Sequence, residues 1–430
     1  MSGSSQAKHL ASPKAYLVVI VAGILAGIVG SAFRVALTAA DDFRIAVVEF
    51  FHTWPLVGWI VPVLGAALAV VIARYLVVRV PEAAGSGVQR VEAAVRAEIE
   101  SDRLRVVPTK FIGGTLAIGS GLALGREGPT VQMTAAIGTK LADSAKVSND
   151  DALSVQSSLA GAGLAVAFNA PLSGVIFVVE ELTKSVRMKV IGMTLLATGF
   201  AVGVMRLLLG TKHDFTVTAT AGPGPFEIPM FIVFGLLVGL LGALYSRTVV
   251  YFLDLFSKFS RVPLLVRAGI VGGAVGLLGW FLPGVVGGGD NLTQQTLNGA
   301  TPLIVVAGIV VIRWFLGPVS YSISAPGGLF APLLVLGAGI GALFGGMVMW
   351  VSSDLFGNPV TYALVGMAGL FAAVVRAPIT GIALVVEMTA TTNQFIPLML
   401  GTAAAVIAAA VVKSEPIYDT LRHRLLKAQH

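Results

Sequence analysis

The stretch Gly119-Ser-Gly-Leu-Ala-Leu-Gly-Arg-Glu-Gly-Pro129 is rich in glycine and carries one arginine and one glutamate between apolar segments. Proline is favoured in the first turn of a helix, where its missing N–H costs no hydrogen bond. Glycines beside it leave backbone amides bare, and a helix N-terminus with bare amides attracts anions. The stretch predicts a helix that begins near Pro129 and binds an anion at its N-terminus, with Arg126, Glu127 and Gly128 at the site.

Glu127 occupies the position at which that anion would bind. Its ionised carboxylate would fill the anion site, and its protonated form would leave it, so a free anion and this side chain compete for one place. Burial and the helix N-terminus shift a carboxyl pKa in opposite directions, so we expect Glu127 to titrate near the working pH. The alternative is a structural acid paired with Arg126. Because a charge in the hydrocarbon costs about 2.5–3.5 kcal/mol on insertion scales, the functional interpretation is favoured.

Three segments in the first half of the chain, one of them within this stretch, recur in the second half in the same order. Segment 125–129 matches 328–332 at an offset of 203, and segment 168–180 matches 375–387 at an offset of 207. Pro81, Gly85 and Gly87 match Pro283, Gly287 and Gly289 at an offset of 202. Internal repeats with interrupted helices are typical of transporters, in which the substrate binds between the repeats.

The composition indicates a polytopic membrane protein. Of 430 residues, 56% are hydrophobic and 12% are charged, and the mean hydropathy is +0.88; a soluble domain has about 25% charged residues. These values exclude a soluble enzyme, a disordered chain and a nucleic-acid binder. There is no cysteine, the five histidines are scattered, and no nucleotide motif is present, so we expect no metal and no cofactor.

The apolar runs predict an all-α membrane fold with two repeats. The first run, 15–33, is long enough to cross a bilayer, and several later runs are short and open at Gly-Pro or Ala-Pro, as in broken or re-entrant helices. We expect a cytoplasmic tail at 1–14, membrane repeats at 15–212 and 229–413, a linker at 213–228 and a cytoplasmic segment at 414–430.

The basic residues set the predicted orientation. The positive-inside rule places both termini in the cytoplasm. It also assigns two basic clusters to cytoplasmic loops: Arg90, Arg96, Arg103, Arg105 and Lys110, and Lys184, Arg187 and Lys189.

The second glycine-proline segment, Gly327-Gly-Leu-Phe-Ala-Pro332, predicts a second anion site at the backbone amides of Leu329 and Phe330. The alternative is close helix packing through small residues.

Glu180 has Glu387 as its equivalent in the second repeat, and we expect its role to be structural. The equivalent of Glu181 is Met388. An acid present in one repeat only favours a directional role such as proton delivery, with a solvated helix-end acid as the alternative. The hydroxyls of Ser86 and Tyr418 are further candidate donors.

Together these motifs resemble the CLC family of chloride channels and chloride/proton antiporters, over essentially the whole chain. The resemblance implies a homodimer of subunits, each with its own pore, built from two inverted-topology repeats of tilted helices. It implies that Ser86, Tyr418, Leu329 and Phe330 bind chloride. It also implies that Glu127 is the gating glutamate and Glu181 the internal proton-transfer glutamate.

One departure from the family pattern bears on selectivity. The serine motif usually reads GSGIP, and this chain has Gly85-Ser-Gly-Val-Gln89. The expected function is exchange of chloride for protons in a bacterial inner membrane, with no nucleic-acid partner. The alternatives are a passive chloride channel gated by voltage or pH, and a fluoride- or nitrate-selective variant. An intramembrane enzyme is disfavoured, because no cysteine or histidine lies within a clear span.

Overall fold

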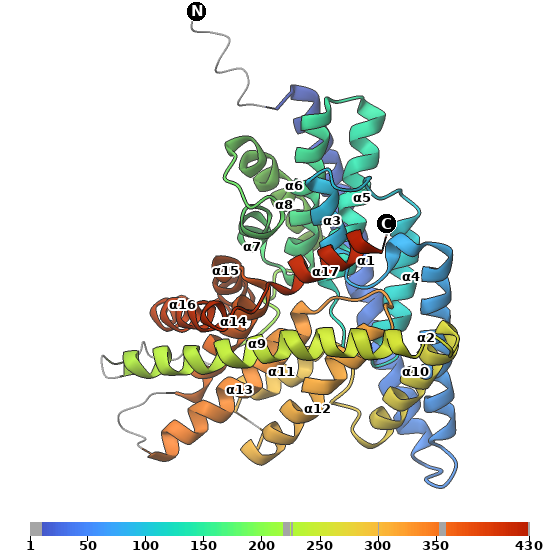
Figure 1. Ribbon diagram of the computed structural model, residues 1–430, viewed down its shortest axis with the longest axis vertical. Helices are drawn as coiled ribbons and strands as arrows, with labels where there is room; N and C mark the ends of the chain where they lie inside the picture. The colour runs from blue at the N-terminus through green and yellow to red at the C-terminus, as the bar shows by residue number, and fades with distance from the viewer. Residues whose placement is uncertain (1–10, 218–223, 225–226, 300, 352–357, 429–430) are drawn as a thin grey trace, which may run out of the picture.

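The computed structural model describes residues 11–217, 224, 227–299, 301–351 and 358–428 (Figure 1). Parts of four expected segments lie outside these ranges: 1–10 of the N-terminal tail, 218–223 and 225–226 of the linker, 300 and 352–357 of the second repeat, and 429–430 at the C-terminus. The described residues form seventeen α-helices and no β-strand, which confirms the all-α prediction.

The helices of the first part of the chain are α1 (Pro13–Phe51), α2 (Ile60–Arg79), α3 (Val88–Val95), α4 (Val106–Gly119), α5 (Glu127–Ala145), α6 (Asn149–Phe168), α7 (Pro171–Phe177) and α8 (Met188–Leu209). A π-helical turn, Val178–Leu182, follows α7 directly. The later helices are α9 (Ile228–Lys258), α10 (Leu264–Phe281), α11 (Asp290–Leu297), α12 (Leu303–Ser322), α13 (Phe330–Val351), α14 (Pro359–Val375), α15 (Pro378–Thr389), α16 (Phe395–Val411) and α17 (Ile417–Lys427).

Seven of these helices are long and apolar enough to cross a membrane: α1, α2, α8, α9, α10, α12 and α13. Four further apolar helices are shorter, namely α4, α14, α15 and α16. A helix rises 1.5 Å per residue, so the 14 residues of α4 and the 12 of α15 are too short to span about 30 Å of hydrocarbon. Short helices of this kind need surrounding protein to satisfy their ends.

The first helix is longer than its apolar run. The prediction of a span at 15–33 identified only the apolar part of α1, which continues to Phe51. The extension carries charges that find partners: Arg34 pairs with Asp214 at 2.6 Å, and Arg44 pairs with Asp41. A prediction from hydropathy ends the span at the first charged residue, because it does not take into account the residues that pair with that charge.

The interior is built from α5, α6 and α14, in which most side chains are buried. Small residues let neighbouring helices approach closely. Where α13 crosses α14, a Cβ on Gly337 would overlap the backbone of Gly366, and a Cβ on Gly366 would overlap the backbone of Gly337. Figure 1 shows α9 running across the molecule, with α14 and α16 beside one of its halves, and α17 returning toward α3.

Candidate anion and proton site

The two glycine-proline segments meet in the interior. Gly125 and Gly328 form the only β-bridge among the described residues: the N–H of each donates to the carbonyl of the other at 2.8 Å. Helix α5 begins two residues after Gly125, and α13 begins two residues after Gly328. The bridge thus brings two helix N-termini, each with a partial positive charge, to one place inside the protein.

The Glu127 carboxylate lies between these N-termini. Its Oε1 accepts a hydrogen bond from the backbone N–H of Phe330 at 2.7 Å, and its Oε2 has no hydrogen-bond partner. The residue is fully buried. An anionic group belonging to α5 therefore sits on the amide of α13. The sequence predicted two separate anion sites, but the structure places the glutamate of the first segment on an amide of the second.

Glycine is required around this carboxylate by close approach. A Cβ on Gly125 or on Gly328 would overlap the carboxylate of Glu127. A Cβ on Gly128 would overlap the side chain and backbone of Ser86. The absence of a Cβ at these three positions leaves room for the carboxylate and for the loop that carries Ser86. Gly128 therefore contributes by lacking a side chain.

Two buried hydroxyls lie beside the same N-termini. Ser86 and Tyr418 are both 0% exposed, and neither hydroxyl has a hydrogen-bond partner. The Tyr418 ring packs on Phe330 with ring centres 5.6 Å apart. Because an unpaired buried hydroxyl is unfavourable, two of them beside helix N-termini make a polar cradle suited to an anion.

The loop that presents Ser86 is held by a buried lysine. Gly85 and Gly87 have φ values of +61° and +92°, which favour glycine. The Lys110 ammonium donates to the carbonyls of Gly85 at 2.6 Å and Ser86 at 3.0 Å, and Lys110 is 0% exposed. Its assignment to a cytoplasmic loop was wrong. A single lysine inside the apolar run 106–119 was the signal that could have corrected it.

The unusual Gln89 lies in the first turn of α3, next to this loop. Its amide nitrogen and the Tyr321 hydroxyl would both lie within 4 Å of a Cβ on Gly85. A polar pair therefore packs against the serine loop where the family pattern has proline.

Glu181 lies in the π-helical turn and is 1% exposed. Its Oε1 has no hydrogen-bond partner, and the charged groups that act on it most strongly belong to Glu92 and Lys184. Glu92 was not among the predicted site residues. It is fully buried and lies 3.7 Å from the Lys184 ammonium and 3.6 Å from the Arg422 guanidinium. Its neighbours Arg90 and Arg96 masked it as part of a basic loop.

Arg126 is held by carboxylates of other elements. Its guanidinium donates to the Ala167 carbonyl at 2.8 Å, to Asp290 at 2.8 Å and to Asp214 at 2.9 Å. Asp214 also pairs with Arg34 at 2.6 Å. Although Arg126 was a candidate anion ligand, its described hydrogen bonds all go to these acceptors.

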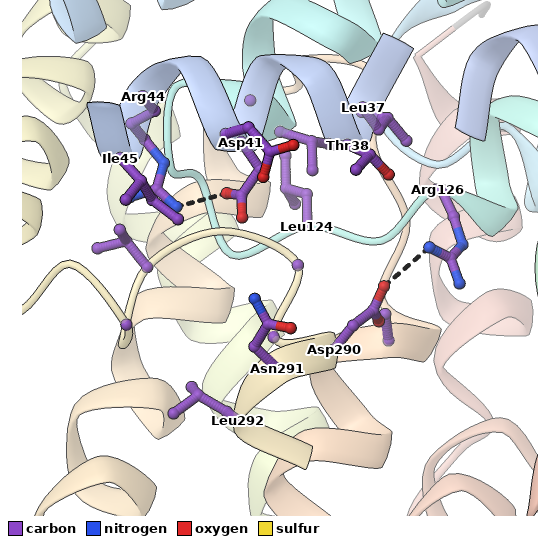
Figure 2. Close-up of a pocket in the computed structure, with 18 of the residues that line it drawn as sticks. Leu37, Thr38, Asp41, Arg44, Ile45, Leu124, Arg126, Asp290, Asn291 and Leu292 are labelled. Carbon is purple, nitrogen blue, oxygen red and sulfur yellow. Dashed lines mark hydrogen bonds and ion pairs between the residues drawn. The ribbon is translucent and has the colours of Figure 1, made fainter. Parts of the chain in front are cut away.

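The Arg126–Asp290 pair forms part of the wall of a cavity of about 260 Å³. Figure 2 shows side chains of α1, among them Asp41 and Arg44, on one side of this cavity and the start of α11 on the other. Leu124 and Gly125 also line it, so the cavity reaches the backbone just before Glu127. Within the described ranges, no group of three or more His, Cys, Asp or Glu residues is arranged to hold a metal ion.

Known proteins are similar to this chain in both sequence and fold. Residues 65–411 match the family model described as voltage gated chloride channel. The H(+)/Cl(-) exchange transporter ClcA of Vibrio cholerae serotype O1 (strain M66-2) is 38% identical over 419 residues, covering 95% of this chain and 89% of that protein. The ClcA of Vibrio vulnificus (strain YJ016) is also 38% identical, over 414 residues, with 94% and 88% covered.

Among solved structures, a slow cyanobacterial Cl−/H+ antiporter matches with a TM-score of 0.93 and 29% identity, covering 97% of this chain and 99% of that one. A CLC-type fluoride/proton antiporter matches with a TM-score of 0.76 and 22% identity, covering 94% of this chain and 96% of that one, which is a likeness of fold. The chain belongs to the CLC family of voltage gated chloride channels.

Proposed function

We propose that this protein exchanges chloride for protons across a membrane. The observation that carries the proposal is the Glu127 carboxylate on the Phe330 amide at 2.7 Å, beside the unpaired hydroxyls of Ser86 and Tyr418. A negatively charged side chain already occupies an anion position there. The proteins named exchange transporter or antiporter among its relatives support the same reading.

Coupling follows from the competition of two negative groups for one site. A proton that binds the Glu127 carboxylate removes its charge and weakens its hydrogen bond to the Phe330 amide. Chloride can then take the donors that the carboxylate releases. When the proton leaves, the carboxylate returns to the amide and displaces the anion. One movement of Glu127 thus links the passage of chloride to the passage of a proton.

Glu181 is the proposed relay between Glu127 and the cytoplasm. It is buried, it has an unpaired oxygen, and charged side chains of Glu92 and Lys184 lie on the side of the basic loops. A carboxyl with no fixed hydrogen-bond partner can accept and release a proton without breaking a strong contact. This arrangement supports a proton route that enters beside α3 and the loop before α8.

The architecture proposed with this function has two repeats, 15–212 and 229–413, of inverted topology. Support comes from paired features: α5 and α13 both begin within a glycine-proline segment, and α7 and α15 both begin at an Ala-Pro step. Both termini would lie in the cytoplasm of a bacterial inner membrane. In this arrangement α9 and the other exposed apolar helices would face lipid. We also propose that the subunits form homodimers.

Purified protein in liposomes tests the exchange directly. A chloride gradient is expected to drive protons against their own gradient. Both Glu127→Gln and Glu181→Gln are expected to lose proton movement while chloride still passes. Chloride flux with no proton movement in the unmodified protein would establish a passive channel instead. Competition by nitrate and fluoride in the same assay ranks the anions, and light scattering of the detergent-solubilised protein gives its oligomeric state.

A further inference from the structure

Helices α7 and α15 pack together, and the start of each is capped by a glutamate: Glu180, in the π-helical turn after α7, caps α15, and Glu387, in the last turn of α15, caps α7. Glu180 accepts from the backbone N–H groups of Ile379 at 3.0 Å and Thr380 at 2.8 Å, and from the Thr380 hydroxyl at 2.8 Å. Glu387 accepts from the N–H groups of Leu172 at 2.9 Å and Ser173 at 2.7 Å. The Ser173 hydroxyl completes the second cap at 2.6 Å.

The two caps are equivalent in every contact. Each carboxylate receives two backbone N–H groups and one hydroxyl in the first turn of the opposite helix. The helical segments also have equal length, because α7 with its π-helical turn spans 171–182 and α15 spans 378–389. Charge-assisted bonds at a helix N-terminus satisfy free amides and complement the helix dipole. Each cap therefore anchors one end of the pair.

The winding of the two helices differs at the capping glutamate. Glu387 lies in regular α-helix, which continues to Thr389. Glu180 lies in the π-helical turn Val178–Leu182, closed by the Thr183 N–H donating to the Val178 carbonyl at 2.9 Å. Single π turns inside α-helices occur often at functional sites. The change of winding therefore sits where the two repeats also differ in sequence, at Glu181 and Met388.

Glu181 follows Glu180 directly, and its own contacts do not fix its direction. None of the described residues forms a hydrogen bond or ion pair with its carboxylate, although the side chain is 1% exposed. Its orientation must then come from the backbone of the π-helical turn. That turn is fixed on one side by the Glu180 cap and on the other by the Thr183 hydroxyl, which donates to the Val178 carbonyl at 2.9 Å.

We propose that Glu180 is a positioning residue for proton transfer: its cap on α15 holds the π-helical turn so that Glu181 stays directed into the protein. Releasing the cap lets the turn relax toward regular winding or fray, and either change rotates Glu181 away. It also frees a second carboxylate next to Glu181. The equivalent cap at Glu387 has no such consequence, because Met388 follows it. The proposal rests on the proposed proton role of Glu181.

The repeat supplies a matched control for the experiment. Glu180→Gln and Glu387→Gln each remove one charge from the same helix pair, so similar losses of melting temperature are expected. In liposomes, Glu180→Gln is expected to lower the ratio of proton to chloride turnover at least about tenfold, because a misplacement of 1 Å can slow the step of a reacting group about 10²-fold. Glu387→Gln is expected to keep the ratio of the unmodified protein. Equal ratios in the two variants would overturn the proposal.

Two further variants keep the outcomes distinct. If Glu180→Gln does not fold, Thr380→Val and Ser173→Ala remove one hydroxyl from each cap, and only the first is expected to lower the ratio. Equal ratios in this milder pair would again overturn the proposal. Glu181→Gln is measured beside them. If it retains the ratio of the unmodified protein, the proton role of Glu181 is itself wrong, and the failure lies there rather than in the cap.

Discussion

The carboxylate of Glu127 and the backbone N–H of Phe330 meet at 2.7 Å, although 203 residues separate them in the chain. The acid comes from the first turn of α5 and the amide from the first turn of α13. Their contact places a titratable group on a donor that an anion would use. Any change that moves the carboxylate off this amide should therefore alter anion binding and proton coupling together.

Gly125→Ala is expected to displace the Glu127 carboxylate. The new Cβ would overlap both carboxylate oxygens, which form the movable end of a side chain. The bridge to Gly328 uses backbone atoms and can persist. With the carboxylate off the Phe330 amide, chloride binding should strengthen and the ratio of proton to chloride turnover should fall. Calorimetric titration with chloride in detergent and liposome flux measure the two effects.

Gly199→Ala is the matched control for this substitution. No atom lies within 4 Å of a Cβ at Gly199, which is in the middle of α8. Alanine there should stabilise the helix by about 0.4–1 kcal/mol and leave coupling unchanged. If Gly125→Ala binds chloride and couples protons like Gly199→Ala, the carboxylate does not compete with the anion at this position.

Local motifs predicted much of the site. Proline after glycine predicts a helix start with bare amides, and both 125–129 and 328–332 begin helices in this way. What local patterns could not predict is the distance between segments, because the Gly125–Gly328 bridge depends on how all the intervening helices pack. The sequence therefore predicted two separate anion-binding segments, and the structure brings these segments together at Glu127.

The charge of a single residue predicted its environment less well than these motifs did. A lysine in an otherwise apolar stretch looks like a loop marker when only its sign is considered. Lys110 is instead buried, and its charge is balanced by the carbonyl dipoles of Gly85 and Ser86. In the same way, Arg126 next to Glu127 looks like its partner, whereas the guanidinium reaches Asp214 and Asp290. Directly adjacent residues point in different directions from a helix, so adjacency in the sequence does not predict an ion pair.

Asp214 and Asp290 both pair with Arg126, and they are expected to differ in their contribution to stability. The Asp214 side chain is 5% exposed and also pairs with Arg34, whereas that of Asp290 is 49% exposed. Asp214→Asn removes the carboxylate that the partly buried guanidinium groups of Arg34 and Arg126 share, which should cost roughly 1.5–3 kcal/mol. Asp290→Asn should cost below about 1 kcal/mol. Thermal denaturation in detergent compares them.

Asp42→Asn controls for the loss of one negative charge near the same cavity. Asp42 lines the cavity and is exposed, so its substitution should change stability by no more than about 0.5 kcal/mol. Equal melting temperatures for the variants of Asp214 and Asp290 would contradict the assigned role of burial. High salt should reduce the stability that Asp290→Asn loses but not the stability that Asp214→Asn loses, because salt screens exposed ion pairs more strongly than buried ones.

Asp419 is expected to hold α17 in a pH-dependent way. Burial raises the pKa of its carboxyl, but hydrogen bonds from Lys184 at 2.9 Å and the charge of Arg422 lower it more, so the pKa lies below its ordinary value. A lowered folded-state pKa adds stability above the unfolded pKa of about 3.9, and this stability is lost as pH falls through the folded value.

Asp419→Asn should therefore lower the free energy of unfolding by a constant amount, at most about 1 kcal/mol, between roughly pH 5 and 8. Below about pH 4 the difference should shrink, because the unmodified protein then also loses the charge. Denaturation across this pH range measures it. In a Lys184→Met background the same substitution should cost less, since the hydrogen-bonding partner at 2.9 Å is already gone. An undiminished cost there would assign the stability to Arg422 instead.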